Sequence, residues 1–327
     1  MILFYIEKFF NKIWYEKKNF LNLIFFLMIP LSLIYLILFE INKLISQKKR
    51  FKTNIVCVGN CNIGGAGKTS TILSLIKIYE KKYTNIVVLL KGYKGKIKQP
   101  IKVDIKKHFS KDVGDEALLY AEHINTFISN NRLLGIKEII SKEKPDLIIL
   151  DDGYQDFSIK KNKNILIINS DLGFGNGMLL PAGPLRELPS NAIQRSDIII
   201  LIGEPNEKMN HILSGNEKLV RANILAKENL SNDKFFAFSG IGNNKSFLKT
   251  LKLNNYNFTM NKSFPDHYSY TQRDIDNIKN ISSKNKLKPI TTEKDIKRLS
   301  ASQKDGIEVL KINIHFENKE KIKTILF

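Results

Sequence analysis

Cysteine is scarce in this chain, which has two cysteines among 327 residues. Cys57 and Cys61 are too few and too close together for a disulfide framework, which excludes a small disulfide-stapled scaffold. The same pair is a poor basis for a metal site. Both residues are typical of small buried side chains in a reducing cytosol.

Acidic residues are also few, with 32 Asp and Glu against 52 Lys and Arg and a formal net charge of +20. No compact Arg/Lys block with interleaved aromatic residues is present, so we do not expect nucleic-acid binding. The lysines are scattered through a chain rich in Ile and Asn. This pattern predicts a solvated basic surface that also favours anionic lipid headgroups.

One long apolar run is present, from Phe20 to Phe39, and it matches the ~20 residues that cross a bilayer core. No small-residue cleavage site follows it, so the run predicts a retained membrane segment rather than a signal peptide. A buried core helix is the alternative. Lysines flank the run on both sides, and both flanks therefore favour the cytoplasm. Pro30 makes a re-entrant or monotopic insertion an alternative to a single span.

A strand-like run, Asn54–Val58, leads into a glycine-rich segment and then a helical stretch, Thr71–Lys82. Glycines let consecutive backbone N–H groups turn toward a phosphate, Lys68 reaches the β- and γ-phosphates, and Thr69 offers a hydroxyl to Mg²⁺. The following helix directs its positive dipole end at the same anion. The pattern predicts ATP or GTP binding, although Asn62 stands where the strict pattern has its first glycine. The predicted nucleotide-binding residues are Asn62, Ile63, Gly64, Gly65, Ala66, Gly67, Lys68, Thr69 and Ser70.

Alternating strand and helix patterns predict an α/β fold of the P-loop NTPase type, with a doubly wound, mostly parallel sheet. The expected buried strands are Ile86–Leu90, Leu147–Leu150, Ile165–Ile168 and Ile198–Ile202, and the expected helices are Ala117–Ile124 and Leu133–Lys142. The glycine- and proline-rich segment Gly173–Gly183 is too long for a simple connection, and such loops usually bind something.

Three parts are expected along the chain: a membrane-associated segment at 1–45, a P-loop core at 46–230 and a smaller α/β domain at 231–327. Polar residues over Lys227–Lys234 mark the boundary before a new strand, Phe235–Ser239. The remaining tail is expected to run helix, loop, helix, strand, helix.

Carboxylates at two places are candidates for holding Mg²⁺ or handling a proton. Asp151 and Asp152 end an apolar strand at the edge where phosphates bind, although two acids there also suit a polar strand exit. Asp115 and Glu116 precede a helix, where capping and catalysis are equally open interpretations. His267, in Phe264–Tyr268, needs a partner that sequence spacing does not reveal.

The chain resembles the tetraacyldisaccharide 4′-kinases, the lipid A kinases of Gram-negative bacteria, along nearly its whole length. The resemblance rests on Val58–Asn60 with Gly64–Thr69, Val113–Glu116, Asp151–Gln155, Gly175–Gly177 with Pro181–Glu187, Phe238–Ile241, Phe264–His267 and Thr291–Asp295. An N-terminal membrane helix is also expected of that family.

This resemblance implies transfer of the ATP γ-phosphate to the 4′-hydroxyl of an acylated glucosamine disaccharide 1-phosphate, at the cytoplasmic face of the inner membrane. It implies that Asp115 is the general base or orienting acid, with His267 as its partner from the second domain, and that the domains close. Glu116, Asp151 and Asp152 then join Thr69 in serving Mg²⁺. No obligate protein partner is implied.

Two departures and one competing function accompany the resemblance. Lys91–Gly95 replaces an Arg-Gly-Tyr-Gly run, and Asp156 replaces a His, which puts substrate contacts in doubt because Lys does not reproduce a bidentate Arg. The alternative function is a membrane-surface P-loop ATPase switch. Such a switch normally has Lys directly before the Gly-Gly pair, where this chain has Ile63.

Overall fold

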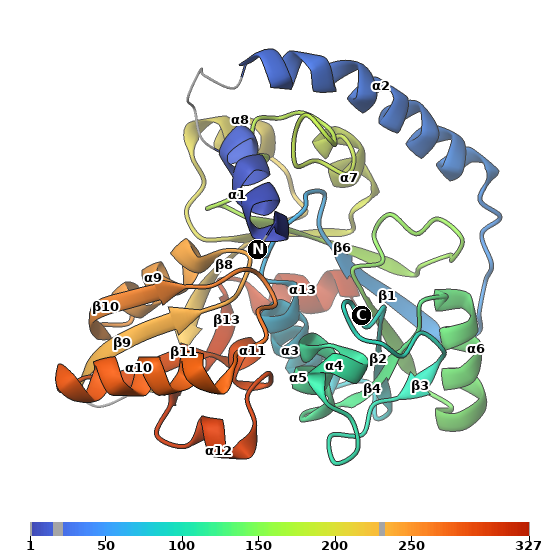
Figure 1. Ribbon diagram of the computed structural model, residues 1–327. Coiled ribbons are helices and arrows are strands. Elements are labelled where there is room, and N and C mark those ends of the chain that lie inside the picture. The colour runs from blue at the N-terminus through green and yellow to red at the C-terminus, as the bar shows by residue number, and fades with distance from the viewer. Residues whose placement is uncertain (1, 16–21, 229–232, 327) are drawn as a thin grey trace. The chain divides into compact units, whose positions relative to one another are not determined.

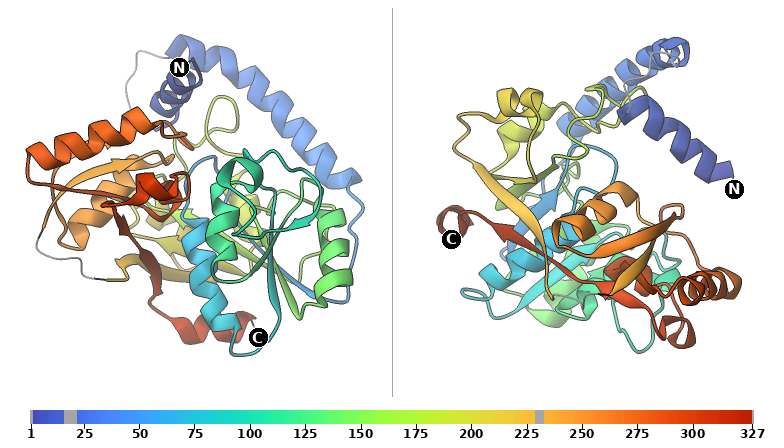
Figure 2. Two further views of the ribbon diagram at one scale, coloured as in Figure 1. Left: turned by 60° about the horizontal axis from the view of Figure 1, so that its bottom comes forward. Right: turned by 90° about the vertical axis from the view of Figure 1, so that its left-hand side faces the viewer.

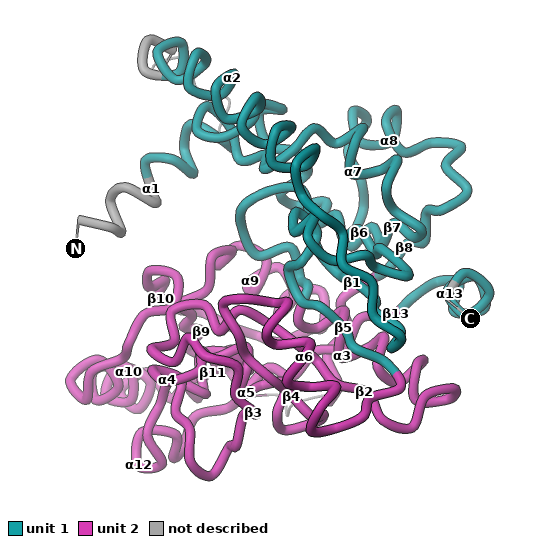
Figure 3. Tube along the Cα trace, turned by 90° about the vertical axis from the view of Figure 1, so that its right-hand side faces the viewer, with its two compact units in different colours: residues 1–68, 147–222, 316–327 teal, residues 69–146, 223–315 magenta. Residues whose placement is uncertain are grey.

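The computed structural model describes residues 2–15, 22–228 and 233–326 (Figure 1). The chain forms two compact units, which Figure 3 colours separately. Unit 1 comprises Met1–Lys68, Leu147–Ala222 and Phe316–Phe327, and unit 2 comprises Thr69–Asp146 and Asn223–His315. The units therefore interleave along the sequence.

Unit 1 is built on parallel strands in the order β8-β7-β6-β1-β5. Their bounds are β1 Asn54–Gly59, β5 Leu147–Asp151, β6 Lys163–Asn169, β7 Ile198–Ile202 and β8 Leu219–Ala226, the last of which continues into unit 2. All residues of β5 and β7 are buried, as expected for parallel strands covered on both faces. β1 lies between β5 and β6, so the loop that follows it opens at the carboxyl edge of the sheet.

Five helices lie mainly in the described part of unit 1: α1 Ile2–Tyr15, α2 Asn22–Ile45, α7 Pro189–Arg195, α8 Glu207–Leu213 and α13 Lys319–Leu326. The predicted apolar run forms α2, and its stretch Phe25–Ile45 is long and apolar enough to cross a membrane. The segment Gly173–Gly183 has neither helix nor strand, so the predicted loop is confirmed, and its binding role stays a prediction.

The first part of unit 2 pairs β2 with β4 in parallel and β4 with the short β3 in antiparallel. These strands are β2 Ile86–Leu90, β3 Ile101–Lys102 and β4 Asn125–Ile128. The helices here are α3 Lys68–Tyr79, whose first residue belongs to unit 1, α4 Ser110–Val113, α5 Asp115–Ala121 and α6 Arg132–Glu143.

A separate four-stranded parallel sheet of unit 2 has the order β10-β9-β11-β12. Its strands are β9 Lys234–Ser239, β10 Asn257–Ser263, β11 Lys288–Thr292 and β12 Glu308–Leu310. The other elements of this region are α9 Asn244–Leu253, α10 Gln272–Lys284, α11 Glu293–Ile296, α12 Ala301–Lys304 and β13 Ile312–Phe316.

Period-two alternation along β9 supplies both faces of this sheet with apolar side chains. Phe236 and Phe238 join a core cluster that includes Ile278 of α10, and Phe235 joins a cluster that includes Phe247 of α9. Figure 2 shows the two helices on opposite sides of the strands.

The α/β class, the four named parallel strands and the two named helices are confirmed. The expectation for the tail was wrong at two places. Its loop contains β10, which pairs with β9, and two short helices and two more strands, α11, α12, β12 and β13, come between β11 and the last helix. The β10 sequence, Asn257–Ser263, is mostly exposed and carries no apolar run, as an edge strand permits. The boundary expected between 230 and 231 lies outside the described residues, and the three-part division stays a prediction.

Candidate active site

The loop after β1 has the glycine geometry that its sequence predicts. Gly64 and Gly67 have φ values of 126° and 83°, which disfavour side chains with a Cβ. A Cβ added to Gly59, at the end of β1, would lie 2.6 Å from the Tyr154 Cβ, so this strand end also requires glycine. α3 begins directly after the loop, at Lys68, and its N-terminus offers backbone N–H groups to an anion.

Asn62 replaces the missing glycine with a hydrogen-bonded brace. The Asn60 side chain donates to the backbone and side-chain oxygens of Asn62, at 2.7 and 2.9 Å, and the Asn62 amide donates to the Gly173 carbonyl at 3.2 Å. Asn62 is buried, and Ile63 N–H donates to the Pro184 carbonyl. The departure from the strict pattern therefore ties the phosphate loop to the 173–184 segment.

Lys68 lies between one amide and one carboxylate. Its ammonium group is 3.0 Å from Asn60 Oδ1 and 3.2 Å from Asp152 Oδ1. Asp152 adopts a left-handed backbone with φ of 54° and also receives Arg186 Nη1 on both carboxylate oxygens, at 2.9 and 3.0 Å. Asp151, the last residue of β5, is buried.

Sequence reasoning gave no role to Arg186, whose guanidinium binds Asp152. A neighbouring contact joins the same two motifs: Gln155 donates to Asn60 O and to Glu187 Oε1, each at 2.8 Å. The motifs Asp151–Gln155 and Pro181–Glu187 are thus one hydrogen-bonded assembly in unit 1. In the sequence both motifs carried the family resemblance, but no local pattern indicated that they contact each other.

Asp115 is the first residue of α5 and is not its cap. Gly114, with φ of 89°, takes the cap position, and no side chain caps this helix. The Asp115 carboxylate turns instead to His267, with 3.1 Å between Oδ1 and Nδ1. Its other oxygen receives Arg298 Nε at 3.2 Å and a second bond from Arg298 Nη2.

His267 and Arg298 together keep the Asp115 carboxylate ionised. Burial alone raises its pKa, but the hydrogen bond from His267 and the positive charge of Arg298 together hold that pKa well below its ordinary value. Conversely, burial lowers the pKa of Arg298, and the charges of Asp115 and Asp295 raise it above its ordinary value.

His267 is fixed by its own backbone and by an aromatic neighbour. It has a left-handed φ of 57°, and its N–H donates to the Gly240 carbonyl at 2.9 Å. The Tyr93 ring meets the imidazole edge-on, with 5.3 Å between ring centroids. Nε2 lies 3.7 Å from Asp266 Oδ2.

Thr69 and Glu116 form a second contact among the predicted residues. The Thr69 hydroxyl lies 3.3 Å from Glu116 Oε1, and the same carboxylate oxygen receives Lys294 Nζ. Hydroxyl and carboxylate oxygens are the ligands that Mg²⁺ prefers. Among the described residues, no cluster of three or more His, Cys, Asp or Glu side chains gathers as a metal site.

The two sequence departures have local structural roles. Lys94, in the Lys91–Gly95 segment, has φ of 60° and donates to the Asp266 carbonyl at 3.2 Å. Asp156 accepts hydrogen bonds from the backbone and side chain of Ser158, at 3.1 and 2.6 Å. Asp156 therefore stabilises a turn.

The structure thus joins Lys68 to Asp152 within unit 1, and it joins Asp115 to His267 and Thr69 to Glu116 within unit 2. A family model described as tetraacyldisaccharide-1-P 4′-kinase, LpxK, matches residues 24–327. The chain belongs to this family.

Known LpxK family members resemble the chain over most of its length. A tetraacyldisaccharide 4′-kinase of Rickettsia felis is 33% identical over 98% of each chain, and one of Rickettsia canadensis is 36% identical over 89% of this chain and 88% of its own. A crystal structure of LpxK from Aquifex aeolicus in complex with ATP is 26% identical, with a TM-score of 0.72 over 91% of this chain and 96% of that one.

Proposed function

We propose that this protein transfers the γ-phosphate of ATP to the 4′-hydroxyl of a tetraacyldisaccharide 1-phosphate, in the biosynthesis of lipid A. The observation that carries this proposal is the 3.1 Å contact between Asp115 and His267, made by residues 152 positions apart in a chain that also has a glycine-rich phosphate loop. Membership of the LpxK family supports the choice of substrate.

Asp115 orients the acceptor hydroxyl and takes its proton, and His267 holds the carboxylate in place. A carboxylate whose pKa is depressed is a weak base toward a ground-state alcohol. Phosphoryl transfer has a loose transition state, so the hydroxyl becomes acidic only as its oxygen bonds to phosphorus. Asp115 therefore accepts a hydrogen bond first and the proton late.

Thr69, Glu116, Asp151 and Asp152 are the proposed residues for Mg²⁺, directly or through water. Mg²⁺ keeps several waters and binds through one or two carboxylates plus substrate phosphates, so it does not need a dense cluster of protein ligands. When bound, it neutralises charge on the transferring phosphoryl group. Lys68 and the backbone N–H groups of the phosphate loop bind and orient the nucleotide.

The first experiment replaces each member of the pair, as Asp115→Asn and as His267→Ala. We expect kcat for the lipid acceptor to fall by roughly 10²–10⁴, with the KM for ATP little changed, because each residue acts at the acceptor hydroxyl. Asp276→Asn and His123→Ala, at exposed positions of the same unit, are matched controls that should keep wild-type turnover. Unchanged kcat in both site variants would remove the pair from the reaction.

The N-terminal helices support a location of the protein at the inner membrane, with its catalytic units on the cytoplasmic side. The midpoint of Phe25–Ile45 contacts unit 1: Tyr35 donates to the Arg186 carbonyl at 2.8 Å, and Ser32 donates to the Leu179 carbonyl at 2.9 Å. If α2 crossed the bilayer, the loop carbonyls of unit 1 that Ser32 and Tyr35 contact would lie in the hydrocarbon centre. Irregular backbone is costly there, so these contacts argue against a transmembrane span.

Contacts on both sides of α2 favour insertion along the membrane surface over a span. Before it, Trp14 of α1 donates to the Pro181 carbonyl at 3.0 Å, and Tyr15 donates to the Ile63 carbonyl at 3.0 Å. After it, Lys49 N–H donates to the Ser158 carbonyl at 2.8 Å. Both flanks lie on unit 1 and therefore on one side of the membrane. This agrees with the lysines on each flank.

A further inference from the structure

The Thr291–Asp295 motif ends in a buried carboxylate that organises the turn around it. Asp295 has no exposed surface. Its Oδ1 accepts from Tyr270 Oη at 2.8 Å and from the Gly240 N–H at 2.9 Å, and its Oδ2 accepts from the Thr292 hydroxyl at 2.6 Å. Asp295 is therefore held from three segments of unit 2.

Arg298, three residues later, joins this carboxylate to Asp115. Its side chain is 5% exposed, and its Nη1 donates to Asp295 Oδ1 at 2.8 Å and to the Gly240 carbonyl at 2.6 Å. The other edge of the guanidinium, Nε and Nη2, donates to Asp115 Oδ2. One planar group thus bridges two buried carboxylates.

The same guanidinium also fixes the segment that carries His267. The Gly240 carbonyl accepts from Arg298 Nη1 and from the His267 N–H at 2.9 Å. Arg298 therefore bonds directly to the Asp115 carboxylate and reaches His267 through two hydrogen bonds that share the Gly240 carbonyl.

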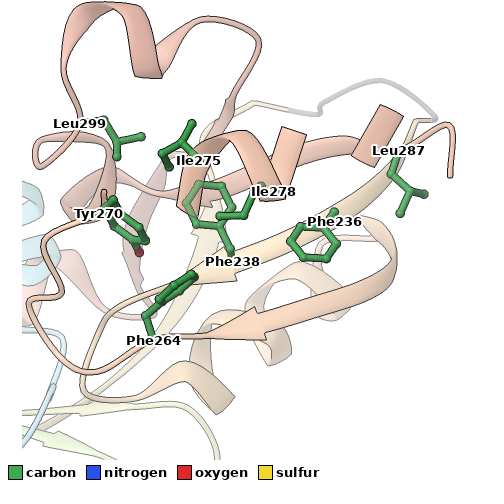
Figure 4. Packing of buried hydrophobic residues seen from close by; sticks show 8 residues of the cluster. All are labelled: Phe236, Phe238, Phe264, Tyr270, Ile275, Ile278, Leu287 and Leu299. Atoms are coloured by element: carbon green, nitrogen blue, oxygen red, sulfur yellow. The ribbon is translucent and has the colours of Figure 1, made fainter. Parts of the chain in front are cut away.

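The apolar core beneath the turn keeps this assembly rigid. Tyr270 packs with Phe238 and Phe264, at centroid distances of 5.6 and 5.0 Å, and Leu299 belongs to the same core cluster. Figure 4 shows the Tyr270 ring beside these side chains. Because packing fixes the ring, its hydroxyl fixes Asp295, and Asp295 in turn fixes one edge of Arg298.

We propose that Arg298, seated on Asp295, is a positioning residue that sets the orientation of the Asp115 carboxylate toward the acceptor hydroxyl. Asp115 gives Oδ1 to His267 and Oδ2 to Arg298, so the two partners together fix the carboxylate plane. The planar guanidinium of Arg, with several N–H donors in fixed directions, can fix a carboxylate plane, whereas the single ammonium of Lys cannot. The inference rests on the proposed role of Asp115.

A double-mutant cycle separates positioning from mere structural support. Arg298→Met should lower kcat for the lipid acceptor by about 10- to 100-fold, the scale of a small misplacement of a reacting group. The KM for ATP should change by less than about threefold. In an Asp115→Asn background the same replacement should change kcat by less than about threefold, because Arg298 acts through the carboxylate that is already gone.

Two further variants keep the test decisive. Arg298→Lys retains the charge but loses the fork of donors, so it should melt closer to the wild-type temperature than Arg298→Met does and still lose about tenfold in kcat. It also replaces Arg298→Met in the cycle if that variant does not fold. Ile278→Ala removes core packing beside the turn and should lower the melting temperature with kcat retained.

Three results would overturn or redirect the inference. An equal loss of kcat in both backgrounds would make Arg298 a structural residue only, and wild-type kcat in Arg298→Met and Arg298→Lys would remove it from the reaction altogether. Full activity of Asp115→Asn by itself would instead refute the proposed role of Asp115, which distinguishes that failure from the failure of this inference.

Discussion

Asn62 illustrates how one side chain compensates for a missing glycine in a phosphate loop. Its amide accepts from Asn60 and donates to the Gly173 carbonyl, so the loop is braced from two directions. The sequence predicted the loop but not the brace, because position 173 is far along the chain and no local pattern connects it to position 62.

Replacing Asn62 with glycine should restore the strict pattern and still weaken the protein. The Gly173 carbonyl loses its donor, so we expect unfolding to become easier by about 1–3 kcal/mol and the KM for ATP to rise by up to about tenfold. Thermal unfolding and ATP titration of Asn62→Gly would measure both effects. Asn216→Gly, at another turn of unit 1 where Asn accepts from a backbone N–H, is the control and should keep the wild-type KM. An Asn62→Gly variant with wild-type stability and KM would contradict the account.

Cys61 gives a pH prediction. Burial, followed by the charge of Glu187, raises the pKa of this thiol from about 9 to about 12. The folded protein therefore keeps the proton more tightly, so this contribution to stability is complete below pH 9 and is lost as the pH rises toward 12. Urea unfolding at pH 8 and pH 10.5 should show wild type losing more stability than Cys61→Ala. Equal losses would show that the thiol does not titrate as described.

At the scale of elements, α2 has two dissimilar faces. Ser32, Tyr35 and Phe39 contact unit 1, the last through an edge-on contact with Phe157 at 5.5 Å. Ile37 and Leu38 are 59% and 61% exposed. An exposed apolar face of this length is expected to enter lipid.

Charging the exposed face should release the protein from membranes. We expect Ile37→Asp combined with Leu38→Asp to lower the fraction that floats with anionic phospholipid vesicles by at least about tenfold, because each carboxylate is costly to bring into the apolar layer. Leu253→Asp, at a leucine that is 69% exposed on α9, is the matched control and should float like wild type. Unchanged flotation of the double variant would mean that this face does not contact lipid.

The strands show which elements a sequence can predict and why. β2 and β7 are uniformly apolar and bounded by polar residues or glycine, so their sequences predict buried strands directly. β10 is mostly exposed, so its composition does not predict a strand. Only its pairing with β9 identifies it as one. For α5, spacing left capping and catalysis open at Asp115, and only contact with His267 across the sequence distinguishes them.

At the scale of the whole molecule, the two compact units are each assembled from separate stretches of the chain. A reading along the chain predicts boundaries where composition changes, whereas compact units follow from contacts between distant residues. Asp115 and His267 accordingly belong to one compact unit, and their contact exists without a movement between units. Closure over bound substrates stays a prediction.

The central claim is that the whole chain is a lipid kinase, and one assay tests it most directly. Wild type and Lys68→Ala are incubated with Mg²⁺, γ-³²P-labelled ATP and a detergent-dispersed tetraacyldisaccharide 1-phosphate. The account predicts a labelled bisphosphorylated lipid with wild type and none with Lys68→Ala, because the lysine binds the transferred phosphate. ATP hydrolysis that rises on membranes without any labelled lipid would contradict the account and favour a membrane-surface ATPase.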